Sequence, residues 1–357
     1  MLAFVVPALL DVLVLGIHVL LPARSREGYV RDAQGRPLRY RLNGLAVLVV
    51  TLVLFGVACH RGWWEPEAFY TYRWEMLAGA NAVGLLFTAF IVLSAPRTAG
   101  SQLLADLYLG RRENPQWGNG RVDAKMYLYL AGAIGLELNV LSFAAYHVHS
   151  FPDDPSPGVL LYAALFTFFL AEYLVFERVH LYTYDFVAER VGFKLGWGCL
   201  VFYPFFYGIG LWTTAYLPNP NTPSWPLAIY AGVFFGGWML ARGANLQKYL
   251  FKVRPEARLF GFLKPAALEA DGHRLLYSGF WGLSRHVNYL GEILMALGLT
   301  LSLGHPTCPW PWLYPLYYLA LLIPRQIDDD RRCAAKYGAL WQEYCRRVPY
   351  RIIPFVY

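Results

Sequence analysis

The C-terminal part of this chain places charged and hydrogen-bonding side chains within strongly apolar sequence. Between Leu275 and Tyr357 the chain reads LLYSGFWGLSRHVNYLGEILMALG, then an apolar aromatic segment, then PRQIDDDRRCAAKYGALWQEYCRRVPYRIIPFVY. Charged groups are costly in membrane-like sequence, and where they occur they usually mark a functional site. The pattern therefore predicts a polar pocket in this part of the chain.

Two lysines indicate what such a pocket could bind. In RGANLQKYLFKVRP, residues 242–255, Lys248 and Lys252 are four apart, so on a helix they share a face and repel each other. A bound anion such as phosphate would relieve the repulsion. Two lysines that extend toward water from a helix end are the alternative, and the spacing alone does not decide. Arg325 and Asp329 are also four apart and can pair, whereas their neighbours are expected to include several solvated charges. These neighbours are Asp328, Asp330, Arg331 and Arg332.

Polar residues interrupt apolar sequence elsewhere as well, namely Asp11, Glu137, Asn139, Glu172 and Arg242. Such residues usually pair inside a helix bundle, so a structural Arg242–carboxylate pair competes with a catalytic role. No metal site is predicted, because His147 and His149 do not share a helical face and the five cysteines form no C-x-x-C pair. The chain also lacks the H-E-x-x-H, G-x-S-x-G, Walker and G-x-G-x-x-G motifs.

Nine apolar runs must position these residues. They cover 2–22, 44–59, 77–95, 127–146, 159–176, 196–217, 226–246, 289–304 and 310–324. As a helix, each is about long enough to cross a bilayer core of roughly 30 Å, the shorter ones marginally. The first run lacks a basic n-region and a cleavage site, so we expect it to be retained. The predicted fold is all-α, a polytopic integral membrane protein with about 9–10 transmembrane helices.

The basic residues fall almost entirely on one side of this layout. Segments 23–41, 96–125, 177–195, 247–286 and 325–357 hold 28 of the 31 Lys and Arg residues. The positive-inside rule places these segments and the C-terminus in the cytoplasm, at a bacterial inner membrane or the endoplasmic reticulum. The net charge of +7 follows from this topology and from contact with anionic headgroups, so no nucleic-acid partner is needed to explain it.

Several motifs occur in a defined order along the chain. YRLNGL spans 40–45, GRRENP spans 110–115 and DAK spans 123–125; RGANLQK with Phe251, SGFWGLSRHVNYLGE and RRCAAKYGALWQEYCRRVPYRIIPFVY follow. Each motif resembles a segment of the sterol reductase family, which includes C-14 sterol reductases, 7-dehydrocholesterol reductases and the membrane domain of the lamin B receptor. Each is moderately specific alone, and all of them in order are a strong signal.

The resemblance implies a ten-helix membrane reductase that uses NADPH, bound in a C-terminal pocket open to the cytoplasm rather than on a Rossmann fold. The chain would be one membrane-embedded domain, with N-terminal helices in 1–180 and a half that binds cofactor and sterol in 181–357. By position, the cofactor residues would be Lys248, Lys252, Trp281, Arg285, His286, Asn288, Tyr289, Arg325, Asp329 and Tyr337.

The chain also departs from the family pattern. The family usually has Arg at Lys252, Asp at Glu172, Glu292 and Cys199, His at Pro324, and its loop glutamate at Arg112, one place before Glu113. Lysine keeps the charge of arginine but loses the bidentate fork. Cofactor binding survives these changes, but the identity of the substrate and of the acid does not transfer safely.

The implied reaction is reduction of a sterol carbon–carbon double bond, with Δ14 preferred over Δ7 and side-chain positions. One alkene carbon needs a proton and the other a hydride, so the pocket must be dry. Tyr207, in the family-like PF-x-Y segment, is the first candidate donor, and Glu137 and Asp185 are candidate relay or orienting groups.

Two other functions stay open from the sequence. Isoprenylcysteine and phospholipid methyltransferases bind S-adenosylmethionine with a shorter R-H-x-x-Y-x-G pattern, which Arg285, His286, Tyr289 and Gly291 also satisfy. The upstream RGANLQK and GRRENP segments favour the reductases. A reductase fold that binds sterol without catalysis is the third possibility, suggested by Cys199 and Pro324.

Overall fold

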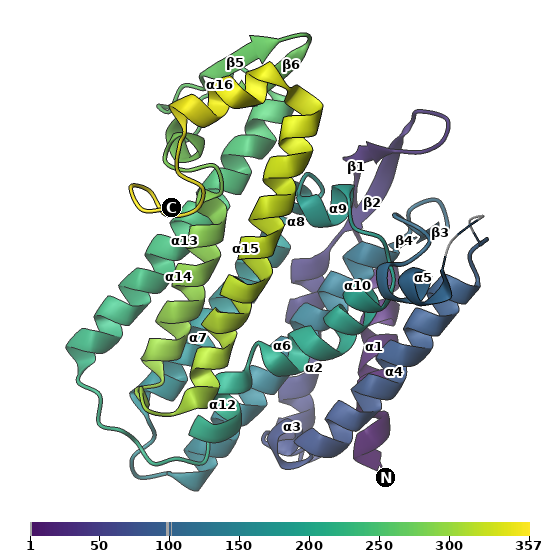
Figure 1. Cartoon of the computed structure of the whole chain (residues 1–357). Coiled ribbons are helices and arrows are strands. Elements are labelled where there is room, and N and C mark those ends of the chain that lie inside the picture. Colours follow the sequence, from purple (N-terminus) through teal and green to yellow (C-terminus); the bar gives the residue numbers. More distant parts are fainter. Residues whose placement is uncertain (1, 98–99, 101) are drawn as a thin grey trace. The chain divides into compact units, whose positions relative to one another are not determined.

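The computed structural model describes residues 2–97, 100 and 102–357, which are predominantly helical (Figure 1). The chain divides into two compact units, Met1–Pro220 and Asn221–Tyr357. Residues 98–99 and 101, part of the predicted loop 96–125, lie outside the described residues. The predicted division of roles at residue 180 stays a prediction.

The first unit consists of membrane-length helices joined by short helices and hairpins. Its longer helices are α1 (Leu2–Leu20), α2 (Gly44–His60), α4 (Arg73–Leu93), α6 (Ala124–Ser150) and α7 (Pro157–Val175). The short ones are α3 (Ala68–Thr71), α5 (Leu103–Leu109), α8 (Glu177–His180), α9 (Tyr184–Val187), α10 (Phe193–Trp197), α11 (Tyr203–Phe206) and α12 (Ile209–Thr214). Two antiparallel hairpins pair β1 (Arg24–Arg31) with β2 (Pro37–Leu42) and β3 (Gln116–Trp117) with β4 (Val122–Asp123).

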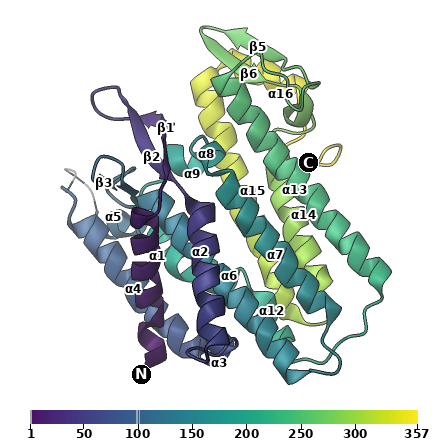
Figure 2. The ribbon, with the colours of Figure 1, turned by 180° about the vertical axis from the view of Figure 1, so that it is seen from behind.

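Helix α6 is the centre of the first unit. In its most apolar window 83% of the residues are buried, and α1, α2, α7 and α11 pack against it (Figures 1 and 2). Asp123 begins the helix by accepting the Met126 N–H at 3.0 Å. Lys125 is fully buried, and its Nζ donates to the carbonyl oxygens of Asp185 and Phe186. The DAK segment therefore ties the start of α6 to α9.

The apolar run at 196–217 is not one regular helix, as a simple span would require. A π-helical turn, Gly198–Phe202, separates α10 from α11, and Pro204 lies in the first turn of α11. Proline removes a backbone donor, and the π-turn accommodates one extra residue. The broken segment contacts α6 closely, because a Cβ atom at Gly132 would lie 2.5 Å from the Cys199 carbonyl oxygen.

The second unit is a three-helix arrangement with a polar end. Helices α13 (Ser224–Val253), α14 (Val287–Ser302) and α15 (Pro309–Tyr337) are followed by α16 (Ala339–Arg347), and β5 (Ala267–Ala270) pairs with β6 (His273–Leu276). Helix α14 packs along α13 and α15. A Cβ atom at Gly291 would lie 2.5 Å from the Gly237 carbonyl oxygen, so small residues allow α13 and α14 to cross closely.

All nine predicted apolar runs fall on helical segments, as the all-α membrane fold predicts. Six helical segments of the described chain are long and apolar enough to cross a membrane, and α2 and α14 are shorter apolar helices. Helix α15 continues through Pro315 and Pro324 as far as Tyr337, so one helix joins the last apolar run to the charged cluster.

The membrane orientation gives a testable prediction. Single cysteines introduced into a cysteine-free variant should react with an impermeant thiol reagent from the cytoplasmic side at 96–125 and 325–357, and from the opposite side at 148–158. Labelling of intact cells reports the cysteines on the non-cytoplasmic side, and labelling of permeabilised cells also reports those on the cytoplasmic side. Reaction of residues 325–357 from the non-cytoplasmic side would contradict the orientation.

Candidate functional site

Four cationic side chains gather on α13 and α15 in the second unit. Lys248 and Lys252 are exposed, one helical turn apart on α13. Lys252 is repelled by Lys248 and by Lys336 of α15, and Lys248 is also repelled by Arg325 of that helix. Lys248 Nζ lies 5.3 Å from the centre of the Trp281 ring. Like charges held this close favour an anionic ligand such as a phosphate group.

Trp281 is fixed beside the lysines by a short 3₁₀-helix, Gly279–Gly282. Its indole Nε1 donates to the Ala244 carbonyl oxygen at 2.8 Å, and Gln247 Oε1 accepts the Phe280 N–H at 3.0 Å. A Cβ atom at Gly243 would lie 2.4 Å from the Phe280 ring, so this approach requires glycine. The small and amide residues of RGANLQK therefore position the indole.

Arg285 and His286 converge on Asp330 of α15. Arg285 Nη2 lies 3.2 Å from Asp330 Oδ2, and His286 Nε2 lies 3.6 Å from Asp330 Oδ1. The side chains of Arg285 and Asp330 are only 7% and 19% exposed. Burial alone would raise the pKa of Asp330, but the contact with His286 and the charges of Arg285 and Arg351 hold it below its usual value. The charges beside Arg325 and Asp329 were expected to include several solvated ones, and Asp330 is not among those, because the folded chain surrounds it with cations.

The C-terminal segment extends this network. The N–H groups of residues 351–353 all donate to the Tyr357 carbonyl oxygen, at 2.8 to 3.1 Å. Tyr357 Oη donates to Gln326 Oε1 at 3.3 Å, and Gln326 Nε2 donates to Asp330 Oδ2 at 2.7 Å. Arg285 Nη1 also lies 3.2 Å from the carbonyl oxygens of Val348 and Pro349. The Arg285 guanidinium is thus engaged within the protein, and its contact with a cofactor stays a prediction.

Asn288 and Tyr289 lie in the first turn of α14. Tyr289 Oη donates to Asp329 Oδ2 at 2.8 Å, and its ring stacks on His286 with centroids 4.9 Å apart. Asn288 Oδ1 is buried and has no hydrogen-bond partner among the described residues, so it can accept from a ligand. Tyr337, at the end of α15, contacts the His273 ring at 5.2 Å. All ten predicted cofactor residues thus belong to the second unit, and most of them join the lysine cluster or the Asp330 network.

A buried ion pair links α13 to α14. Arg242 Nη1 donates to Glu292 Oε1 at 2.7 Å, and both side chains are largely shielded from solvent. Arg242 is thus paired with a carboxylate, as the structural interpretation of this residue requires. Both charges lie within apolar helices, where an unpaired charge would be costly.

The three predicted proton-transfer residues belong to the first unit. Tyr207 follows α11, where its ring contacts those of Phe202 and Tyr203. Glu137 of α6 is fully buried: Oε1 accepts from Thr167 Oγ1 at 2.7 Å, and Oε2 has no hydrogen-bond partner among residues 2–97, 100 and 102–357. Helix α11 is bound to α6, since Asn139 Nδ2 donates to the Pro204 carbonyl oxygen at 3.0 Å.

Asp185 lies in the first turn of α9, where its carbonyl oxygen accepts from Lys125. Across the described residues, no group of three or more His, Cys, Asp or Glu side chains is arranged to hold a metal ion.

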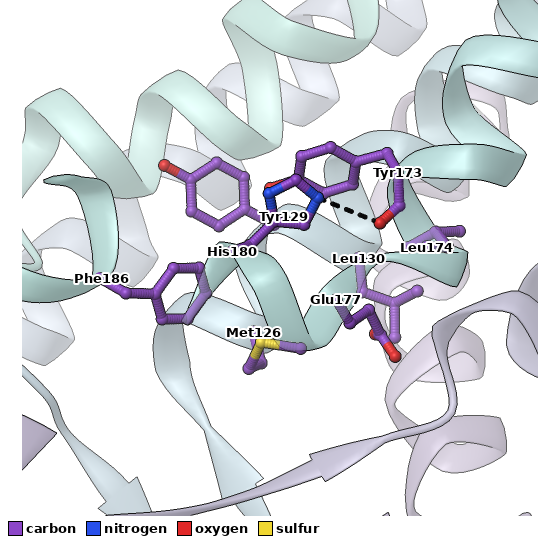
Figure 3. Close-up of a pocket in the computed structure, with 8 residues that line it drawn as sticks. All are labelled: Met126, Tyr129, Leu130, Tyr173, Leu174, Glu177, His180 and Phe186. Carbon is purple, nitrogen blue, oxygen red and sulfur yellow. Dashed lines mark hydrogen bonds between the residues drawn. The ribbon is translucent and has the colours of Figure 1, made fainter. Parts of the chain in front are cut away.

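A separate polar group of the first unit surrounds Glu177 (Figure 3). The Glu177 carboxylate accepts the Gly44 N–H at 3.1 Å and thus caps α2. His180 stacks on Tyr173, and together with Glu177 they line a cavity of about 10 Å³. That volume suits at most about one water molecule, so this cavity is no substrate site.

Glu177 gives a pH-dependent prediction. Burial raises its pKa to about 7 from 4.5, although the Gly44 N–H opposes the shift. The folded state therefore binds the proton of Glu177 more tightly than the unfolded state does. The stabilisation from this protonated carboxyl is fully present below pH 4.5 and is lost as the pH rises through about 7. Glu177→Gln cannot ionise, so it should remove this pH-dependent loss of folding stability, which is at most about 3 kcal/mol. Melting temperatures of both proteins from pH 5 to 8 test this, and parallel curves would contradict it.

Comparison with known proteins then places the chain. Residues 2–357 match the ergosterol biosynthesis ERG4/ERG24 family. The chain belongs to this family. It is 34% identical to a Delta(14)-sterol reductase of Arabidopsis thaliana over 95% of this chain and 91% of that protein. It is also 34% identical to the Delta(14)-sterol reductase TM7SF2 of Mus musculus (96% and 84%), and 32% identical to a Delta(14)-sterol reductase of Methylotuvimicrobium alcaliphilum (96% and 80%).

Membership of the ERG4/ERG24 family confirms the predicted resemblance and the all-α, multi-pass membrane fold. Sequence reasoning missed a role for Gln326, Asp330, Lys336 and Tyr357, although the last two lie in a C-terminal signature. Asp330 lies one helical turn after Gln326 and on the face opposite Asp328. This spacing indicates that Gln326 and Asp330 share a face, but it does not show which other residues that face contacts.

Proposed function

We propose that this protein reduces a carbon–carbon double bond of a sterol with NADPH, and that the Δ14 bond is its substrate. The cation cluster of Lys248, Lys252, Arg325 and Lys336 carries the cofactor part of this proposal, because it is built for a phosphate-rich ligand. The names of the related proteins support the sterol and the Δ14 position. The match over the whole chain favours a reductase over a methyltransferase.

The residues of the second unit fit NADPH in charge and in chemistry. The lysines would hold phosphate groups, the Trp281 indole offers a flat apolar surface beside them, and Asn288 Oδ1 offers an unused buried acceptor. When bound, NADPH supplies the hydride. The Asp330 network keeps Arg285 and His286 in fixed positions, which lowers the entropy lost on binding.

Proton delivery is assigned to the first unit. Tyr207 would donate its phenolic proton to one alkene carbon, since a phenol with an ordinary pKa near about 10 is neutral at pH 7 and can lie in apolar surroundings without a buried charge. Glu137, with one carboxyl oxygen unused, would restore that proton. Apolar helices around both residues keep water from a carbocation-like intermediate.

The deciding experiment is activity of the purified protein in detergent with a panel of Δ14, Δ7 and side-chain alkenes, and with NADPH or NADH. We expect conversion of the Δ14 sterol and NADPH oxidation in equal amounts. Mass spectrometry of the sterols and absorbance of the cofactor measure both. Methyl transfer from S-adenosylmethionine, or sterol binding without conversion of any alkene, would overturn the proposal.

A double lysine variant tests the cofactor site. Lys248→Ala/Lys252→Ala should raise the apparent KM for NADPH at least about tenfold, which corresponds to roughly 1.4 kcal/mol, and should reduce the preference over NADH. Arg346→Ala/Arg347→Ala is the control, because it removes the same charge from exposed residues that pair with Glu343. Equal use of both nicotinamides by the unmodified protein would contradict the phosphate site.

A further inference from the structure

The segment that joins α13 to β5 makes a tight turn with two phenylalanines at its tip. Leu259 and Leu263 exchange two backbone hydrogen bonds of 3.0 Å, which close the turn. Phe260 and Phe262 are 57% and 69% exposed, and their rings are neighbours, with centroids 6.3 Å apart. Exposed apolar residues are common when they occur singly, so the backbone beneath this pair is the more informative feature.

That backbone makes phenylalanine a costly residue at the tip. Phe260 and Gly261 both have positive φ angles, 53° and 80°. Glycine, asparagine and aspartate adopt this conformation most readily, and bulky side chains rarely do. The β5–β6 turn has the same pair of angles, 50° and 74°, at Asp271 and Gly272, which are the residue types expected there. Phenylalanine at residue 260 therefore does not serve the backbone, and the ring itself indicates a function.

The turn is held firmly at its base. Leu259 is only 2% exposed. Ser278 Oγ donates to the Lys264 carbonyl oxygen at 3.3 Å and accepts the Ala266 N–H at 2.8 Å, and the Ala266 carbonyl oxygen accepts the Tyr277 N–H at 3.0 Å. These bonds attach the segment to the residues that precede the 3₁₀-helix. The two rings are thus displayed by an ordered segment, which lowers the entropy lost on contact with a partner.

Cations flank the two phenylalanines. Arg258 and Lys264 stand on the two strands of the turn, and Arg254 follows the end of α13. All three side chains are exposed, and within the described part of the chain they form no hydrogen bond or ion pair. Glu256, the acidic residue of the segment, lies 3.8 Å from Arg274. Residues 254–264 therefore carry a net charge of +2 around an apolar tip.

The length of α13 indicates what surrounds the turn. Ser224–Val253 is a candidate membrane span of 30 residues. As a helix it is about 45 Å long, and a bilayer with both headgroup layers is about 40–45 Å thick. Leu259 follows Val253 by only six residues. The charge distribution predicts that this end of α13 is cytoplasmic. The segment thus leaves the helix at the level of lipid headgroups.

We propose that Phe260 and Phe262 insert into the membrane surface at this end of α13, at the boundary between headgroups and acyl chains. Aromatic rings are stabilised at that boundary, and arginine and lysine beside them extend to the headgroup phosphates. The three cations complement an anionic lipid surface. An apolar protein partner would leave them uncompensated, whereas lipid satisfies both the rings and the charges. Insertion fixes the depth of the end of α13, which carries Lys252.

Spin labels on single cysteines test this proposal in a cysteine-free variant of the full chain. Nanodiscs of phosphatidylcholine and phosphatidylglycerol that hold one copy prevent a second copy from covering the turn. The label is placed at Phe262→Cys, and Asp271→Cys is the control, because it lies in the other turn with the same φ angles. Power saturation compares collisions with oxygen, which dissolves in the bilayer, and with a water-soluble nickel chelate. We expect a preference for oxygen at residue 262 and for the nickel chelate at residue 271.

A preference for the nickel chelate at both residues would place the turn in water and overturn the proposal. Few collisions with either reagent at residue 262 would mean that protein covers the turn, which would overturn it as well. The readout is contact with lipid, so failure of the proposed reductase activity would not affect this result.

A second variant tests the role of the ring at residue 260. Phe260→Asn keeps a residue that accepts a positive φ angle but removes the ring, so the label at residue 262 should shift toward the nickel chelate. The melting temperature in detergent should stay unchanged, because the ring is exposed. An unshifted label, or a lower melting temperature that identifies the ring as a packing residue, would contradict insertion of Phe260.

Discussion

Asp330→Ala is expected to destabilise the second unit by about 3–5 kcal/mol, the usual effect of removing one partner from a buried ion pair. The substitution would leave the Arg285 guanidinium buried without its carboxylate and would remove the acceptor of Gln326. The apparent melting temperature in detergent should fall by roughly 5–15 °C. NADPH affinity should fall as well, because Arg285 and His286 lose their common anchor.

The neighbouring Asp328 provides the matched control. It pairs with Arg332 on the same helix, but the two side chains are 49% and 59% exposed, so Asp328→Ala should cost less than about 1 kcal/mol. The pH dependence gives a second check. The lowered pKa of Asp330 means that its contribution is present above about pH 4 and is lost as the pH falls below it. Similar melting temperatures for the Asp330 and Asp328 variants would refute the role of the network.

Tyr207→Phe is expected to lower turnover by at least about 10²-fold, the usual contribution of general acid catalysis. The variant keeps the ring contacts with Phe202 and Tyr203 and loses only the phenolic hydroxyl group. The KM for NADPH should barely change, because the candidate cofactor residues belong to the other unit. Steady-state kinetics with the Δ14 sterol measure both constants.

Tyr203→Phe is the control, since it removes a phenol from the adjacent helix α11 and keeps its aromatic packing. We expect nearly normal turnover for this variant. Near-normal turnover in Tyr207→Phe as well would remove Tyr207 from the mechanism. Glu137→Gln would then be the next variant, because Glu137 Oε2 is buried and has no hydrogen-bond partner among the described residues.

Some contacts of the candidate site could be predicted from the sequence and others could not, for physical reasons. The shared face of Lys248 and Lys252 was predictable, because a spacing of four places two side chains on one face of any helix. The Arg242–Glu292 pair was predictable only in part. Apolar surroundings require that Arg242 have a partner, but only the crossing of α13 and α14 selects Glu292 as that partner. The π-turn at Gly198–Phe202 was not predictable, since it depends on how that segment packs against Gly132.

By itself, the sequence determined the helical membrane class, the apolar spans, the family and the residue types of the candidate cofactor site. These depend on composition, local spacing and motif order, which are properties of consecutive residues. Only the tertiary structure decided that Asp330 is largely shielded among cations whereas the side chain of Asp328 is half-exposed, and that the C-terminal segment holds Arg285 in place. Burial and charge compensation depend on residues distant in the chain. Two aspartates that are close in the sequence, such as Asp328 and Asp330, therefore acquire different surroundings when the helices pack.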